Sequence, residues 1–226
     1  MKIFAVINAK KIVLVDDHPL MNKGLRLLLS AQPGLSICGV AGSVQEAIAL
    51  VEAEKPDLVI TDLTLPGRNG LELIKDLGAS HPELPVIVLS MHDELLYAER
   101  VLRAGGRGYV TKDAPPEHIV EAIHCVLGGG VFASAAVTNQ FLQALVPGKS
   151  PGKAGFPLKR LTDRELEVFE LIGLAKSTHA IACQLGISPR TVDVHRAHIR
   201  EKLGLEDGNA LTRHAIRWVE AGTIGS

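Results

Sequence analysis

Apolar and polar positions alternate along the first half of the chain in a repeated pattern. Five short strand-like segments, most of them rich in Val, Ile and Leu, lie at residues 11–15, 35–40, 57–61, 85–90 and 107–111. Apolar runs of this kind are typical of strands buried on both faces, as in parallel sheets covered by helices. Amphipathic helical patterns separate the runs. We therefore predict an α/β doubly wound parallel five-stranded sheet, a flavodoxin-like fold with strand order 2-1-3-4-5.

The C-terminal part of the chain has helical signals only. Thr162 and Glu165 form a capping box, and Ser188 before Pro189 is a strong helix start signal. Helices are predicted over 178–185, 189–203 and about 209–220. We predict a second, all-α domain over residues 158–226, with a helix-turn-helix pair.

A linker joins the two predicted domains. Residues 129–157 contain a short helical pattern at 135–146 and then PGKSPGKAGFP, whose Pro, Gly and Lys content is typical of a flexible tether. The first domain is predicted to span residues 11–128, and the boundary lies near residue 150.

Composition adds little to this picture. The 226 residues are 46% hydrophobic and 22% charged, as in ordinary globular proteins. Apolar stretches fall short of the roughly 20 residues of a membrane helix, and the N-terminus lacks the features of a signal peptide, so we predict a cytoplasmic protein with no membrane partner. Cys38, Cys125 and Cys183 are interpreted as reduced core residues. The formal net charge of -1 does not by itself indicate a nucleic-acid partner.

Polar side chains follow four of the five predicted strands. Because the carboxyl ends of parallel strands meet at one edge of the sheet, these side chains should converge. Three of them are carboxylates, which repel one another unless a hard cation such as Mg²⁺ lies between them. The predicted Mg²⁺ ligands are Asp16 through water, Asp17, Asp62 and the backbone carbonyl of Thr64.

A carboxylate in such a site can also attack a phosphoryl group. Asp62, at the end of the central strand, is best placed for this role. Ser90 would then hydrogen-bond one phosphoryl oxygen, and Lys112 would neutralise another. The alternative for any one of these residues is an ordinary polar strand end.

Residues 11–128 resemble a response-regulator receiver domain. The resemblance rests on Asp16-Asp17, the segment DLTLPGRNG that starts at Asp62, Ser90 after VIVL, and GYVTK ending at Lys112. It implies that Asp62 accepts a phosphoryl group from a sensor histidine kinase or a small phosphodonor, with Mg²⁺ required. It also implies no enzyme activity beyond slow self-catalysed phosphorylation and dephosphorylation.

The receiver resemblance further implies a switch. Ser90 would move toward the phosphoryl group and Tyr109 would change rotamer, although Tyr109 could equally be a half-buried packing residue. Asp113 follows Lys112 where many receivers have proline, so a cis-proline is not assumed there. As a hypothesis, Thr64 and His92 flank the path of water to the acyl phosphate and tune its lifetime. Substitutions of these residues that leave the dephosphorylation rate unchanged would contradict this hypothesis.

The predicted helix 189–203 has two different faces. Val192, His195 or Arg196, Ile199 and Leu203 should pack inward. Basic, hydroxyl and short apolar groups on the outer face suit phosphates and thymine methyls in a major groove, whereas the alternative is a plain solvated helix face. The predicted DNA-binding residues are Arg190, Thr191, Asp193, Val194, Arg196, Ala197, His198, Arg200 and Lys202.

The segment from Leu161 to Leu205 is similar to the LuxR-type helix-turn-helix, and with the receiver it resembles a NarL/FixJ-family regulator. The matching residues include Leu161-Thr162, Ile181-Ala182, Ile187-Ser188 and Thr191-Val192. The resemblance implies a phosphorylation-controlled, sequence-specific DNA-binding transcription regulator that binds double-stranded promoter DNA. Its active state would either free the recognition helix or promote formation of a homodimer that binds paired half-sites. Asp193 and Ala197 replace lysines common in the family, and residues 178–180 replace a usual Asn-Lys-Glu, so base readout and one phosphate contact should differ.

Two alternatives remain open. The chain could bind DNA without regard to phosphate, with the acidic pocket serving only structure. It could instead be an aspartyl-phosphate phosphatase, suggested by Asp62-Leu63-Thr64, but such enzymes need a second acid where Thr64 stands.

Overall fold

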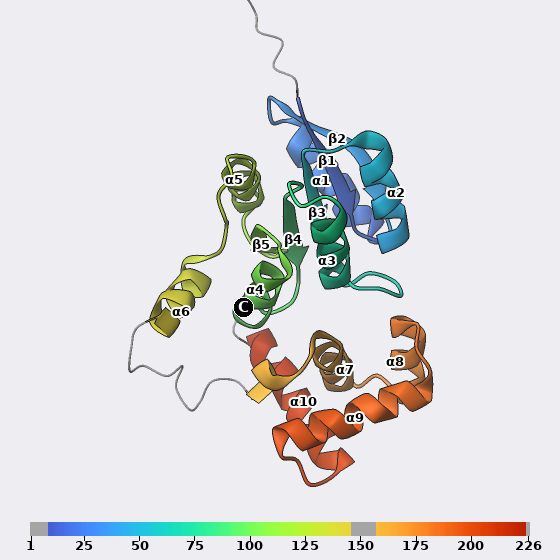
Figure 1. Cartoon of the computed structure of the whole chain (residues 1–226). Helices are drawn as coiled ribbons and strands as arrows, with labels where there is room; N and C mark the ends of the chain where they lie inside the picture. The colour runs from blue at the N-terminus through green and yellow to red at the C-terminus, as the bar shows by residue number, and fades with distance from the viewer. Residues whose placement is uncertain (1–8, 146–156, 225–226) are drawn as a thin grey trace, which may run out of the picture. The chain divides into compact units, whose positions relative to one another are not determined.

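The chain forms two units, as seen in a computed structural model (Figure 1) that describes residues 9–145 and 157–224. The division falls between Thr138 and Asn139. The Pro- and Gly-rich part of the predicted linker, apart from Pro157, lies outside the described residues.

The first unit is built on a five-stranded parallel sheet with the order β2-β1-β3-β4-β5. This confirms the predicted α/β fold and strand order. Each strand end differs from the prediction by at most one residue. The strands are β1 Lys10–Val15, β2 Leu35–Ala41, β3 Leu58–Thr61, β4 Val86–Ser90 and β5 Gly108–Thr111.

Helices cover both faces of this sheet (Figure 1). On one face, Leu25 and Leu29 of α1 and Ile123 of α5 pack in one cluster with Ile12 and Leu14 of β1. The neighbouring strand residues point to the other face, where they are also buried. Burial on both faces explains why β1, β3 and β4 are apolar along most of their length. The helices are α1 Pro19–Ser30, α2 Val44–Glu54, α3 Gly70–Ser80, α4 Glu94–Ala104 and α5 Pro116–Leu127.

The chain after α5 returns to the sheet, which the sequence did not predict. Gly129 has a positive φ of 86°, a conformation that glycine adopts without strain. Phe132 then forms a parallel bridge with Gly108 of β5. Helix α6, Ala135–Leu145, follows, in the region where a short helix was predicted.

The second unit is helical. Its elements are a 3₁₀ turn η1 Pro157–Arg160, α7 Asp163–Gly173, α8 Thr178–Leu185, α9 Pro189–Leu203 and α10 Gly208–Ile224. The bounds of α8 and α9 are those predicted, because Ser177 and Ser188 cap their starts and Gly186 and Gly204, both at positive φ, end them. The last helix is longer than predicted.

The cysteine prediction was wrong in one respect. All three thiols are free, but Cys125 and Cys183 are exposed and Cys38 is only partly buried. Cys125 lies on the outer side of α5, where its Sγ donates to the Val131 carbonyl.

None of the helices in the described ranges is long and apolar enough to cross a membrane.

Candidate functional site

The predicted acidic pocket is present at the carboxyl ends of β1, β3 and β5. The Asp16 and Asp62 side chains are each 5% exposed, and Lys112 lies between them. Its Nζ is 2.6 Å from Asp16 Oδ2 and 2.7 Å from Asp62 Oδ2. Burial alone lowers the pKa of Lys112, but the bonds to the two carboxylates outweigh it and raise the pKa above its ordinary value. The ammonium group therefore stays charged and compensates the two buried carboxylates.

His18 also belongs to this pocket, although the sequence did not single it out. Its Nδ1 is 2.9 Å from Asp16 Oδ1 and 3.0 Å from Asp17 Oδ1. Asp17 is exposed, and its carboxylate faces His18. His18 precedes Pro19 at the start of α1, so the β1–α1 turn holds it beside the acidic pair. Histidine directly after an acidic pair is the one signal that could have indicated this position.

The donor atoms in the pocket fit a hard divalent cation. Ligand atoms of Asp16, His18 and Asp62 all lie within 4.8 Å of one another. Two of these donors are buried carboxylate oxygens, which Mg²⁺ prefers, and the exposed Asp17 adjoins them. The pocket is therefore compatible with Mg²⁺.

The side chains expected to sense phosphate and relay its presence are clustered beside the pocket. Ser90 is fully buried at the end of β4, and its Oγ accepts from the His92 amide at 3.4 Å. Tyr109 is 2% exposed, and its hydroxyl donates to the His92 carbonyl at 2.8 Å. Thr64 Oγ1 is 2.9 Å from His92 Nε2. His92 thus contacts three of the predicted residues.

Gly70 allows the loop after Asp62 to close against the start of α3. Its amide donates to the Leu63 carbonyl at 2.9 Å. A Cβ at position 70 would lie 2.2 Å from the Asp62 carbonyl oxygen and 3.0 Å from Leu63 Cα. Both neighbours are backbone atoms, so the loop that carries Asp62 would have to move.

We expect Gly70→Ala to lower the free energy of unfolding by about 3 kcal/mol, the upper end for overpacking, because no side chain can rotate away. Urea unfolding measures this. The matched control is Gly78→Ala on the same helix, where nothing lies within 4 Å, and it should stabilise by up to about 1 kcal/mol. Equal effects of the two substitutions would contradict this account of Gly70.

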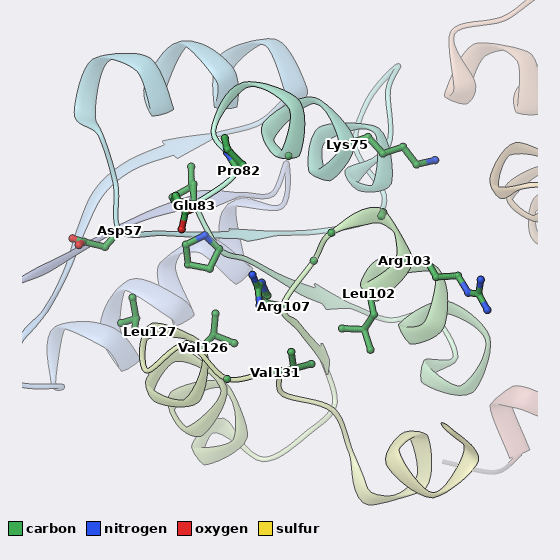
Figure 2. Close-up of a pocket in the computed structure, with 18 of the residues that line it drawn as sticks. Asp57, Lys75, Pro82, Glu83, Leu102, Arg103, Arg107, Val126, Leu127 and Val131 are labelled. Atoms are coloured by element: carbon green, nitrogen blue, oxygen red, sulfur yellow. The ribbon is translucent and has the colours of Figure 1, made fainter. Parts of the chain in front are cut away.

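A second hollow, of about 880 Å³, lies at the opposite edge of the sheet (Figure 2). It is lined by the starts of strands and the ends of helices, including Lys10, Asp57 and Arg107. Lys10 and Asp57 pair with each other at 2.7 Å. None of the predicted site residues lines this hollow.

In the second unit, α9 presents a mixed polar and apolar face to solvent. Val192 and Ile199 are fully buried, as the helical pattern predicted. His195 and Arg196 are both partly buried, and burial together with the nearby Arg164 charge lowers the pKa of His195. Val194 is 46% exposed. The exposed residues that were predicted to contact DNA are Arg190, Asp193, Val194, Ala197 and His198, while Thr191, Arg196, Arg200 and Lys202 are partly buried.

Lys202 forms an ion pair inside the domain, which the sequence did not predict. Its Nζ lies 2.6 Å from Oε2 of the buried Glu165. Glu165 also accepts from the Thr162 amide, completing the predicted capping box. Burial raises the pKa of Glu165, but the bonds to Lys202 and Thr162 outweigh it and lower the pKa below its ordinary value of 4.5. Lys202 thus joins the end of α9 to the start of α7.

We expect Lys202→Met to destabilise the second unit by about 2 kcal/mol. Removing one partner of a fully buried pair costs about 3–5 kcal/mol, and this pair costs less because the Lys202 side chain is 35% exposed. Because the Glu165 pKa is lowered on folding, the stabilisation is complete above the unfolded pKa near 4.5 and is lost as pH falls through the folded value. Urea unfolding at pH 7 and pH 4 tests this. If the free energies of unfolding of wild type and variant differ as much at pH 4 as at pH 7, the expectation is contradicted.

The geometry of both units agrees with their matches to known families. Residues 12–124 match the response regulator receiver domain, and residues 159–215 match the luxR family of bacterial regulatory proteins. The chain belongs to the response regulators that join a receiver to a LuxR-type helix-turn-helix, the NarL/FixJ family.

Individual relatives extend this similarity over nearly the whole chain. The chain is 33% identical to the oxygen regulatory protein NreC of Staphylococcus aureus, over 92% of this chain and 97% of NreC. A LuxR-family response regulator from Aurantimonas sp. SI85-9A1 is 34% identical with a TM-score of 0.56, over 58% of this chain and 94% of that one. RcsB of Salmonella enterica serovar Typhimurium, bound to promoter DNA with the phosphomimetic BeF₃⁻, is 26% identical with a TM-score of 0.68, over 92% of this chain and 98% of RcsB. A further RcsB structure, 25% identical with a TM-score of 0.57 over 91% of this chain and 97% of RcsB, contains dimers bound to DNA.

Proposed function

We propose that this protein is a transcription regulator whose binding to promoter DNA is controlled by phosphorylation of Asp62. The observation that carries the proposal is the bridge from the Lys112 ammonium to Asp16 and Asp62 in one buried pocket. The units proposed are a receiver at 11–128, a linker at 129–157 and a DNA-binding domain at 158–226. Within these units, we propose for each site residue the role that the sequence predicted for it.

In the proposed phosphorylation step, one Asp62 carboxylate oxygen attacks the phosphorus of a phosphodonor, and the donor's leaving group departs. Asp16, Asp17, Asp62 and the Thr64 carbonyl would hold Mg²⁺. Bound there, Mg²⁺ would screen the carboxylates and stabilise charge on the transferred phosphoryl oxygens. Lys112 is close enough to Asp62 to hold a second phosphoryl oxygen, and Ser90 would hold a third. The donors proposed are a cognate sensor histidine kinase and small acyl phosphates.

The proposed output is the exposed face of α9. Ser188 and Pro189 start this helix, so its first turn, with Arg190, would enter the major groove. Two copies would bind paired half-sites, as the symmetry of dimeric helix-turn-helix proteins requires. The RcsB dimers on DNA support the homodimer. The protein would act in the cytoplasm, where promoter DNA lies.

Intact mass spectrometry tests the input of this proposal. Incubation with acetyl phosphate and Mg²⁺ should add the mass of one phosphoryl group per chain, and EDTA should prevent the addition. Absence of the adduct in Mg²⁺ would contradict phosphorylation control. In that case the alternative of a phosphate-independent regulator would hold.

A further inference from the structure

The loop between β4 and α4 is tied to the phosphate-sensing residues at its start. It follows Ser90 and runs through His92 to Asp93, which caps α4. The Tyr109 hydroxyl donates to the His92 carbonyl at 2.8 Å, and the His92 ring bonds with Thr64 at 2.9 Å. A displacement of Ser90 toward a phosphoryl group would therefore act on this loop directly.

The same loop leads into Glu94, the first residue of α4, which bonds to the start of α6. Glu94 Oε1 accepts from Ser134 Oγ at 2.8 Å. The Ser134 hydroxyl in turn accepts from the Val137 amide at 3.2 Å, and the Ser134 carbonyl accepts from the Thr138 amide at 2.9 Å. These are the bonds of an N-cap serine. A hydroxyl has one proton to donate, and Ser134 donates it to Glu94.

A second contact holds the residues just before Ser134. The Tyr109 amide donates to the Phe132 carbonyl at 3.1 Å, and the Phe132 amide donates to the Arg107 carbonyl at 2.9 Å. The segment 131–134 is thus fixed to β5 by its backbone and to α4 by one side-chain bond. Figure 1 shows the chain running from α5 through this segment to α6. The backbone bonds join the segment to β5, whereas the side-chain bond joins it to Glu94, the first residue after the β4–α4 loop.

We infer that the Glu94–Ser134 hydrogen bond carries the phosphorylation state of the Asp62 pocket to α6 and so to the linker, an inference that rests on the proposed function. Without phosphate, the bond holds the first turn of α6 against α4. When Ser90 and its loop move, Glu94 moves with the start of α4 and the bond weakens. Glu94 and Ser134 are positioning residues: they act on α6 and do not touch the phosphoryl group.

The test compares full-length wild type with Glu94→Ala and a matched control, Glu99→Ala, which removes an ion pair to the exposed Arg103 from the same helix. The readouts are hydrogen exchange of residues 135–143 and the ratio of DNA dissociation constants without and with acetyl phosphate and Mg²⁺. Phosphorylation should speed exchange at the start of α6 in wild type. In Glu94→Ala, exchange should already be fast without the phosphodonor, and the ratio should fall at least about threefold.

Two further readouts separate this role from a structural one. The phosphoryl adduct measured by intact mass should be unchanged in Glu94→Ala. Adding Ser134→Ala should reduce the affinity ratio no further, because the Glu94–Ser134 bond is already absent. Ser134→Ala also removes the N-cap bond to the Val137 amide, so only the affinity ratio is compared in this double variant. Ser134→Thr, which keeps a hydroxyl, should behave as wild type, as should Glu99→Ala. Wild-type exchange and a wild-type ratio in Glu94→Ala would overturn the inference.

The outcome for wild type distinguishes this inference from the proposed function. A wild-type protein that takes up phosphate without any change in DNA affinity contradicts the proposed function. In that case hydrogen exchange alone tests whether the Glu94–Ser134 bond links the Asp62 pocket to α6. Faster exchange at the start of α6 in phosphorylated wild type and in Glu94→Ala supports this link. Unchanged exchange in either protein overturns it.

Discussion

Asp62→Asn should abolish formation of the phosphoryl adduct. The amide is a far weaker nucleophile than the carboxylate. Of the two carboxylates bonded to Lys112, Asp62 is the one that follows the central strand, β3. Asp16 shares Lys112, but it is also held by His18 through its other oxygen. Intact mass after incubation with acetyl phosphate and Mg²⁺ measures the adduct, which should fall from about one per chain to none.

The matched control is Asp57→Asn. Asp57 is also an ion-paired aspartate, but it lies at the opposite edge of the sheet with Lys10. This variant should be phosphorylated as wild type is. Persistence of the adduct in Asp62→Asn would mean that another residue is the phosphoacceptor.

Val194→Glu should reduce affinity for operator DNA at least about tenfold, equivalent to about 1.4 kcal/mol. The side chain is 46% exposed on α9, so the substitution leaves the core intact. It places a carboxylate on the face proposed to enter the major groove, where it would repel phosphates and lose an apolar contact. Gel-shift titration against a selected binding site measures the change.

Leu142→Glu provides the matched control for this substitution. Leu142 is 56% exposed on α6, outside the helix-turn-helix. Its substitution by glutamate introduces the same charge as Val194→Glu. Its affinity should remain within about twofold of wild type. Equal loss in both variants would indicate a general charge effect and would contradict the placement of α9 in the groove.

The sheet could be predicted because its signals are local. Runs such as 12–15 and 86–89 are apolar throughout since both of their faces are buried. The capping residues Thr162 and Ser188 likewise act on amides only three positions away. The carboxyl-edge cluster was predictable as well, because parallel topology alone brings Asp62 and Lys112 to one edge.

The missed contacts join residues far apart in the chain through side chains with several possible partners. Lys202 reaches Glu165 across 37 positions, although its charge pattern on α9 equally suited a phosphate contact. Ser134 reaches Glu94 across 40 positions. The exposure of Cys125 and Cys183 could not be predicted either, because cysteine is tolerated on both faces of an amphipathic helix. Such pairings depend on how helices pack, which local patterns do not fix.

The most direct test of phosphorylation control is the affinity of wild-type protein for its operator, measured before and after phosphorylation of the same preparation. Binding sites selected from genomic DNA supply the operator, and intact mass confirms the phosphorylated fraction. We predict that phosphorylation tightens binding by at least about fivefold, the lower end of typical coupling between sites. Equal affinity of the fully phosphorylated and unphosphorylated protein would contradict the account.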